Sequence, residues 1–196
     1  EEGKVSVDGV TYALPEPFMV IATQNPFGSV GTQKLPESQM DRFMIRVTMG
    51  YPSVEDEVSI MKSKTGGLSN RVLSKNVINA QDFMAMRDIV DEVYVDDSIY
   101  EYVAKIVAKT RDSEDILQGI SPRGSISIIN MAKAEAFLRG HDYVLPSDIQ
   151  FVLNDTMAHR IILNRSLKRG HITEESVIDS ICRSVDVPKI GTRGIL

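Results

Sequence analysis

The sequence changes character near residue 50, and this change constrains the fold more than any other feature. Two continuous apolar runs of strand length, at residues 18–22 and 43–49, come before it. Runs of this kind are typical of strands that are buried on both faces of an α/β sheet. After it, apolar residues recur at helical spacing. The sequence therefore predicts α/β followed by all-α: the last strands of a core sheet, then an all-helical domain.

A β-hairpin is predicted at the N-terminal end. Residues 4–7 and 10–14 alternate apolar and polar side chains on either side of Asp8-Gly9. An Asp-Gly pair is a common signature of a two-residue type I′ turn, because both turn residues need a positive φ. We therefore expect the two segments to pair as antiparallel strands.

Start signals and apolar stripes place the helices of the second part. Ser53 followed by Asp56 forms a partial capping box, and Ser121-Pro122 places a good N-cap before a proline at the first helical position. A last amphipathic segment covers about residues 174–185. The faces expected to be buried in three of the helices are Ile99, Val103, Ile106 and Thr110; Ile126, Ile129, Lys133 or Ala132, and Ala136; and Ile149, Val152, Leu153, Thr156 and Met157.

Composition disfavours several classes of protein. Apolar residues make up 42% and charged residues 25% of the chain, as in an ordinary globular domain. The net charge of −5 disfavours a nucleic-acid-binding surface, which needs a basic face. Cys182 is the only cysteine and the three histidines lack ligand spacing, so we expect no metal site. No apolar run approaches the ~18 residues of a membrane span.

Two polar side chains stand at the ends of the predicted strands. Asn25 comes just after the strand at 18–22, where α/β proteins bind ligands, and its amide would donate to a phosphate oxygen and hold an attacking water. The alternative is a turn-forming Asn-Pro pair. Arg42 lies between a short helix and the strand at 43–49, from where it would reach a neighbouring subunit's nucleotide as an arginine finger. The alternative is a surface arginine paired with Asp41.

Arg123 is the third candidate. It lies in the first turn of the helix that begins at Pro122, where the helix macrodipole disfavours a cation. A helix N-terminus and an arginine that point to one place form an anion-binding site. A solvated surface arginine is the alternative.

Three separated motifs carry a family resemblance. ATQNP at residues 22–26, LPESQMDRF at 35–43 and SPRG at 121–124 occur in the order found in the MoxR family of AAA+ ATPases. The chain resembles that family over most of its length outside residues 60–95.

The resemblance implies a role for each candidate. Asn25 matches sensor 1 and Arg42 matches the arginine finger, so both would be catalytic. Asn25 and Arg123, which matches sensor 2, would bind the nucleotide. Arg123 would come from the helical lid and close over the γ-phosphate. No residue of this chain is expected to hold a metal.

The resemblance also implies what the whole protein does. It would be an ATPase of the cytoplasm that depends on ATP and Mg²⁺, self-associates into a ring, expected to be a hexamer, and remodels or assembles protein complexes as a chaperone does. Its partners would be client proteins, among them proteins with metal-binding adhesion-type domains. Neither nucleic acid nor a membrane span is expected.

The phosphate-binding part of such an ATPase is not in this sequence. The motif G-x-x-x-x-G-K-[ST] occurs nowhere, and the family's order places it and the Walker B acidic residues before sensor 1. We therefore expect a C-terminal fragment that is inactive alone. Its parts would be the end of the α/β core (1–50), a connector (51–79), a helical lid (80–165) and a C-terminal extension (166–196).

Two other hypotheses stay open at this point. One is another AAA+ motor, such as a magnesium-chelatase-like subunit or a DNA-associated motor, although the acidic balance disfavours DNA. The other is a stand-alone helical protein-interaction module. Walker A and Walker B motifs upstream of Glu1 would favour an ATPase over the interaction module.

Overall fold

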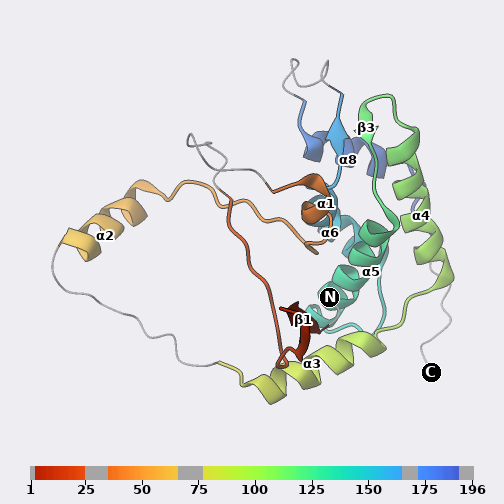
Figure 1. Ribbon diagram of the computed structural model, residues 1–196. Coiled ribbons are helices and arrows are strands. Elements are labelled where there is room, and N and C mark those ends of the chain that lie inside the picture. The colour runs from red at the N-terminus through yellow and green to blue at the C-terminus, as the bar shows by residue number, and fades with distance from the viewer. Residues whose placement is uncertain (1–2, 25–34, 66–76, 165–171, 190–196) are drawn as a thin grey trace.

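Four helices enclose the hydrophobic core. The computed structural model describes residues 3–24, 35–65, 77–164 and 172–189. Buried apolar side chains of these residues all lie between Val93 and Val185. The core therefore belongs to the helical part of the chain. Its four helices, packed together in Figure 1, are α4 (Asp97–Asp112), α5 (Pro122–Leu138), α6 (Pro146–Met157) and α8 (Glu174–Arg183).

The predicted buried faces of α4 and α6 are confirmed. Every residue named for them is at most 3% exposed. Helix α5 differs, because Ile126 is 61% exposed. Small side chains dominate the buried face of this helix and let it approach its neighbours closely. The buried residues of α5 are Gly124, Ser127, Ile128, Ala132 and Ala136.

The starts of α5 and α6 are capped in different ways. Ser121 accepts a hydrogen bond from the Gly124 amide at 3.4 Å, as the Ser-Pro sequence predicts. Leu145, which precedes α6, has no capping side chain. The Asp148 carboxylate instead accepts from the Leu145 amide at 2.8 Å. A side-chain hydrogen bond thus defines the first residue of each helix.

Two short strands tie the start of α5 to the end of α6. β3 (Ile116–Gln118) and β4 (Ile162–Leu163) pair antiparallel, with Ile116 opposite Leu163 and Gln118 opposite Ile162. This pairing holds the chain that leaves α6 beside the chain that enters α5. The candidate site lies where these two connections meet.

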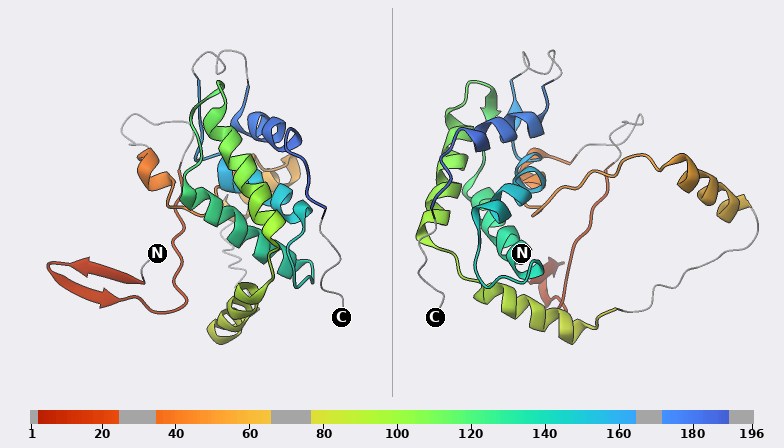
Figure 2. Two further views of the ribbon diagram at one scale, coloured as in Figure 1. Left: turned by 90° about the vertical axis from the view of Figure 1, so that its right-hand side faces the viewer. Right: turned by 180° about the vertical axis from the view of Figure 1, so that it is seen from behind.

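The predicted N-terminal hairpin is present. β1 (Lys4–Val7) pairs antiparallel with β2 (Val10–Ala13). Asp8 and Gly9 both have a positive φ, 49° and 80°, as a type I′ turn requires. In the left-hand view of Figure 2 the hairpin projects away from the helices, and all its strand residues are exposed.

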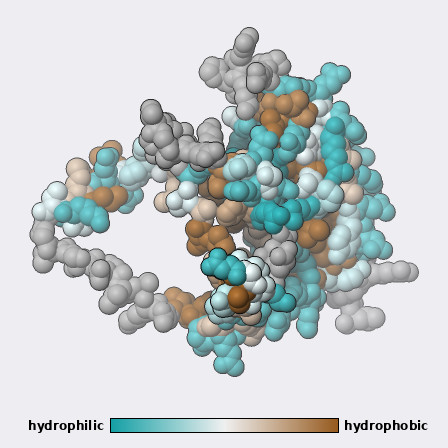
Figure 3. Space-filling model, viewed as in Figure 1, coloured by the Kyte–Doolittle hydropathy of each residue, from teal (hydrophilic) through white to brown (hydrophobic). Residues whose placement is uncertain are grey.

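The two buried strands predicted at residues 18–22 and 43–49 are not formed. Neither segment pairs with another strand among the described residues, and Ile21 and Met49 are 83% and 93% exposed. Figure 3 shows apolar groups, in brown, at several places on the surface. A strand needs a partner for its amide and carbonyl groups, and the described residues offer none. The predicted order, a part with strands followed by a helical part, is nevertheless confirmed: the hairpin comes first, and the helices of the core follow.

Three further helices lie outside the core: α1 (Glu37–Met40), α2 (Val54–Thr65) and α3 (Ala80–Glu92). Helix α2 begins as predicted, because the Ser53 hydroxyl accepts from the Asp56 amide at 3.1 Å. It stands apart from the helical body in Figure 1, and none of its residues is buried. No helix in the described part of the chain has the length and apolar character needed to cross a membrane.

Candidate functional site

The structure brings together the segments that carry two of the three predicted site residues. Arg42 is exposed and follows the single-turn helix α1, while Arg123 lies in the first turn of α5. Asp41 links them, because its Oδ2 lies 3.8 Å from Arg123 Nη1. Asn25 lies outside the described residues.

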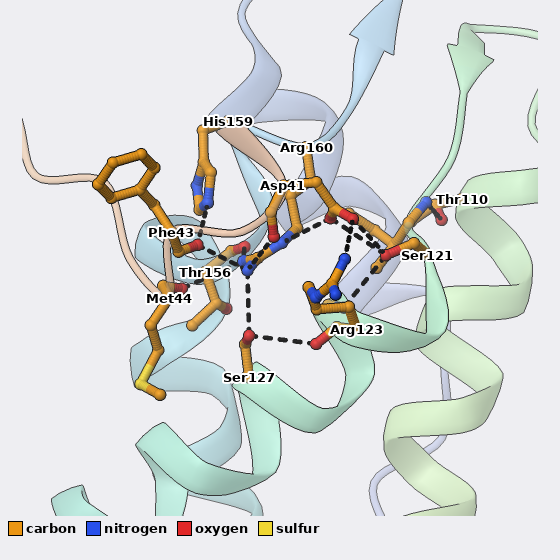
Figure 4. Close-up of polar contacts among 12 residues, drawn as sticks. Asp41, Phe43, Met44, Thr110, Ser121, Arg123, Ser127, Thr156, His159 and Arg160 are labelled. Carbon is orange, nitrogen blue, oxygen red and sulfur yellow. Dashed lines mark hydrogen bonds and ion pairs between the residues drawn. The ribbon is translucent and has the colours of Figure 1, made fainter. Parts of the chain in front are cut away.

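Asp41 is the centre of this region (Figure 4). The Ser121 hydroxyl lies within hydrogen-bond distance of both carboxylate oxygens, at 3.1 and 3.0 Å. Arg160 donates from Nε to Oδ1 at 3.1 Å. Three residues of the helical body, Ser121, Arg123 and Arg160, thus hold the carboxylate that precedes Arg42. The position of Arg42 is therefore set relative to the start of α5.

Arg160 also binds the backbone on both sides of Arg42. Its Nη2 donates to the carbonyl oxygens of Asp41 at 3.1 Å and Phe43 at 2.7 Å, and its Nη1 donates to that of Met44 at 3.1 Å. The side chain of Arg160 is 1% exposed and comes from the turn between α6 and β4. Few arginines are buried so completely.

The buried guanidinium is stabilised by its partners. Burial lowers the pKa of Arg160 from its ordinary value, and the Asp41 carboxylate acts in the opposite direction. Nη1 also donates to the Thr156 carbonyl oxygen, and Nη2 donates to the Ser127 hydroxyl at 3.0 Å. A buried charge without such partners would be strongly destabilising. Arg160 therefore fastens the chain around Arg42 to α5 and α6.

His159 adds a second bond to the same stretch. Its Nε2 donates to the Phe43 carbonyl oxygen at 3.0 Å, and the residue is 7% exposed. Burial lowers the pKa of His159 to about 4; the charge of Arg160 acts in the same direction, and the bond to Phe43 opposes it. The ring is therefore neutral at pH 7. It holds Phe43 without adding a positive charge beside Arg160.

Gly124, the glycine of SPRG, has a packing role. A Cβ at this position would collide with Ile120 and would lie 3.1 Å from the Cδ of Arg160. Ile120 has little freedom to move, because it is 1% exposed and its carbonyl accepts from Arg111 Nε at 2.8 Å. A residue without a side chain thus lets Arg160 cross the first turn of α5.

A cavity of about 260 Å³ opens beside this network, between α1 and the turn before α5. Its lining mixes polar and apolar surface and places the carboxylates of Glu37 and Asp41 beside the Arg160 guanidinium, which is already paired with Asp41. Across the described ranges, no group of three His, Cys, Asp or Glu side chains is placed to hold a metal ion. The lining residues are Glu37, Ser38, Asp41, Gln118, Gly119, Ser121 and Arg160.

Sequence reasoning missed the residues that connect the two arginines. Asp41 entered it only as a surface partner for Arg42, and neither His159 nor Arg160 was singled out. One signal was available: the His159-Arg160 pair is flanked by apolar residues, Met157 and Ala158 before it and Ile161 after it. A cation in such a place needs a partner, but the pattern alone does not say which one.

Two protein families match separate parts of the chain. The family described as "ATPase family associated with various cellular activities (AAA)" matches residues 1–45, which include Asn25 and Arg42. The family described as "AAA lid domain" matches residues 108–181, which include Arg123 and Arg160. The site described above therefore joins the two matched parts.

Individual relatives agree with these matches. The chain is 42% identical to the uncharacterized protein YeaC of Bacillus subtilis over 188 residues and 34% identical to chaperone MoxR1 of Mycobacterium tuberculosis over 199. These alignments cover 96% and 97% of this chain but 58% and 52% of the relatives. The chain thus spans little more than half their length. A magnesium-chelatase subunit ChlI homolog of Methanocaldococcus jannaschii is more distant, at 24% identity over 162 residues, 79% of this chain and 41% of that protein.

A solved structure shares the arrangement of the elements. The crystal structure of a candidate ATPase from Cytophaga hutchinsonii is 34% identical in sequence and superposes with a TM-score of 0.83. The match covers 96% of this chain and 59% of that one. The extended segments outside the helical body therefore have counterparts in a longer protein.

Proposed function

Because this chain belongs to the MoxR family of AAA+ ATPases, we propose that it supplies the arginine finger and the helical lid of a ring-forming ATPase. The whole protein would couple ATP hydrolysis to the remodelling or assembly of protein complexes in the cytoplasm; the chaperone among its relatives supports this. The ring would be a hexamer. Its clients would be proteins, including ones with metal-binding adhesion-type domains.

This chain would supply arginine side chains to the reaction, and it would not supply the phosphate-binding loop. It contains no G-x-x-x-x-G-K-[ST] loop. The P-loop, the Walker B acid and the ligands of Mg²⁺ would come from the part of the ATPase core that the longer relatives contain. Asn25 would act as sensor 1 by orienting the attacking water.

The contact of Arg123 with Asp41, the residue directly before Arg42 in the chain, carries the proposal. An arginine finger acts on the nucleotide of the neighbouring subunit, where it stabilises charge that develops in the transition state. Asp41 precedes Arg42 in the chain and lies 3.8 Å from Arg123. We infer that both arginines serve one nucleotide, that of the neighbour, and that Arg123 senses its γ-phosphate from the start of α5.

The parts of the chain would divide this work. Residues 1–50 would be the end of the α/β core, 51–79 a connector, 80–165 the lid and 166–196 a C-terminal extension. The extension would complete the lid, because α8 packs against α4 and α6. It does so through Val177, Ile178 and Ile181.

The exposed apolar segments fit the same proposal. Residues 18–22 and 43–49 would pair within the core sheet of the full-length protein, where strands buried on both faces are apolar throughout. The likeness to the longer candidate ATPase over 96% of this chain supports it.

Subunit mixing in the full-length protein tests the two arginine assignments. Arg42→Ala is expected to keep nucleotide affinity and to lower turnover by about 10³-fold or more, as removal of a finger does in GTPases. When Arg42→Ala or Arg123→Ala subunits are mixed with subunits that lack the P-loop lysine, turnover should return, because each variant supplies the group that the other lacks.

The control is Arg183→Ala, which removes an arginine that lies on α8 and bonds the Asp179 carbonyl oxygen at 3.2 Å. It should leave turnover unchanged. Failure of Arg42→Ala to recover in mixtures would remove the finger assignment. Failure of Arg123→Ala alone would mean that Arg123 acts on the nucleotide of its own subunit.

A further inference from the structure

Arg160 has no part in the proposed chemistry, yet its hydrogen bonds converge on the backbone around Arg42. The carbonyl before Arg42 and the carbonyl after it both accept from Arg160 Nη2, at 3.1 and 2.7 Å. The Met44 carbonyl accepts from Nη1 at 3.1 Å. One guanidinium therefore fixes three carbonyl groups of residues 41–44.

The other contacts of this stretch with the helical body are made by the Asp41 carboxylate, with Ser121 and Arg123, and by the residues that follow Arg42. Residues 43–49 belong to no strand ladder among the described residues. The Phe43 carbonyl accepts from His159, and Arg46 is bonded through its amide to the Asp155 carbonyl at 2.8 Å and through its side chain to Glu175 at 3.1 Å. The Arg46–Glu175 pair is exposed and contributes little. Burial makes Arg160 the firmest of these attachments.

We propose that Arg160 is the positioning residue of the arginine finger: it holds residues 41–44 so that Arg42 meets the nucleotide of the neighbouring subunit. This inference rests on the proposed function of Arg42. The physical reason is that a guanidinium stabilises a transition state only when it lies at hydrogen-bond distance from the charge that develops there. A misplacement of about 1 Å can lower the rate by about 10²-fold. Arg160 does not itself touch the nucleotide.

The same guanidinium also joins the turn that carries Arg123. Ser127 accepts from Arg160 Nη2 at 3.0 Å and donates to the Arg123 carbonyl oxygen at 3.1 Å. Asp41 accepts from Arg160 and faces Arg123 (Figure 4). The finger and the first turn of α5 are thus fixed to one side chain and keep a common position relative to the neighbour.

A double-mutant cycle in the full-length protein tests the proposal. Arg160→Lys keeps the charge but cannot reach the three carbonyls at once, since its ammonium lacks the planar fork of arginine. We expect turnover to fall by about 10- to 100-fold while nucleotide affinity stays within about 3-fold. In an Arg42→Ala background the same substitution should cost less than about 2-fold, because a residue that acts through Arg42 has nothing left to position.

Ser127→Ala is a milder second variant that removes one acceptor of Arg160 and keeps α5 folded. It should lower turnover several-fold, again only when Arg42 is present. Its matched control is Ser125→Ala on the same helix, which faces the groove beside Tyr100 and Ile129 and should change nothing. Ile178→Ala, in the core of α8, controls for lost stability: any fall in turnover that it causes should persist in the Arg42→Ala background.

The outcomes are distinct. Equal losses from Arg160→Lys with and without Arg42 would show a structural role and overturn the inference, as would unchanged turnover in folded Arg160→Lys and Ser127→Ala proteins. If Arg42→Ala itself left turnover unchanged, the finger assignment would fail and the inference would fall with it.

Discussion

At the scale of single residues, the site depends on one buried cation beside one neutral imidazole. Arg160 and His159 are neighbours in the chain, both are buried, and both bond the Phe43 carbonyl oxygen. Two positive charges at this spacing would repel each other strongly in a medium of low dielectric constant. The Asp41 carboxylate is the only acidic partner of Arg160 within the described ranges. The arrangement therefore requires His159 to stay neutral.

The His159 pKa predicts how stability changes with pH. The folded chain holds this pKa near 4, against 6.5 for an ordinary histidine. Below pH 6.5 the unfolded chain takes up a proton that the folded chain refuses, so the stability present above pH 6.5 is lost as the pH falls towards 4. The loss should reach about 3 kcal/mol. Urea unfolding of wild type and His159→Gln from pH 7 to pH 4.5 measures it.

Subtracting the unfolding free energy of His159→Gln from that of the wild type removes the contribution of all other titrating groups. Glutamine can still donate to the Phe43 carbonyl but takes up no proton, so the difference in unfolding free energy should narrow as the pH falls. A difference that stays constant over this range would show that His159 titrates normally in the folded chain.

At the scale of elements, the sequence predicts what depends on neighbours along the chain. The Asp8-Gly9 turn, the Ser53 and Ser121 caps and the apolar faces of α4 and α6 are all local patterns, and the structure confirms them. Residues 18–22 and 43–49 have strand composition but no strand partner in the described part of the chain. The composition of a segment indicates whether a strand there would be buried. Whether the strand forms depends on a partner strand for its backbone hydrogen bonds, and that partner is far away in the sequence.

A substitution at Gly124 tests how closely Ile120 and Arg160 must approach the first turn of α5. Gly124→Ala should raise the intrinsic helix propensity of α5 by about 1 kcal/mol. We nevertheless expect a net loss of about 1–3 kcal/mol, because the new methyl group would overlap Ile120 and crowd the stem of Arg160. Thermal unfolding measures the change. Gly50→Ala is the matched control, since a Cβ there meets no atom within 4 Å; a loss of equal size at both positions would rule out the packing explanation.

At the scale of the whole molecule, motifs identified the arginines but not how they are arranged. Arg42 and Arg123 could be proposed from DRF and SPRG because each motif is short and continuous. The contact of Arg123 with Asp41, next to Arg42, could not, because the tertiary fold is needed to bring α1 beside the first turn of α5. The same holds for Arg160, whose bonds to residues 41–44 join segments that are 116 to 119 residues apart in the sequence.

Whether the isolated chain hydrolyses ATP depends on which catalytic groups it contains. Arginines stabilise charge on a phosphoryl group only after other groups have bound and aligned it, and in P-loop ATPases the P-loop and Mg²⁺ do this. The 196-residue chain contains neither a P-loop sequence nor, among its described residues, a metal-ligand cluster. We therefore expect no Mg²⁺-dependent ATP hydrolysis above background when it is purified alone. The control is the same chain with Arg42→Ala and Arg123→Ala, in which contaminating ATPase activity would be unchanged. Phosphate release that rises with chain concentration and disappears in the double variant would show that these 196 residues hold a complete catalytic site.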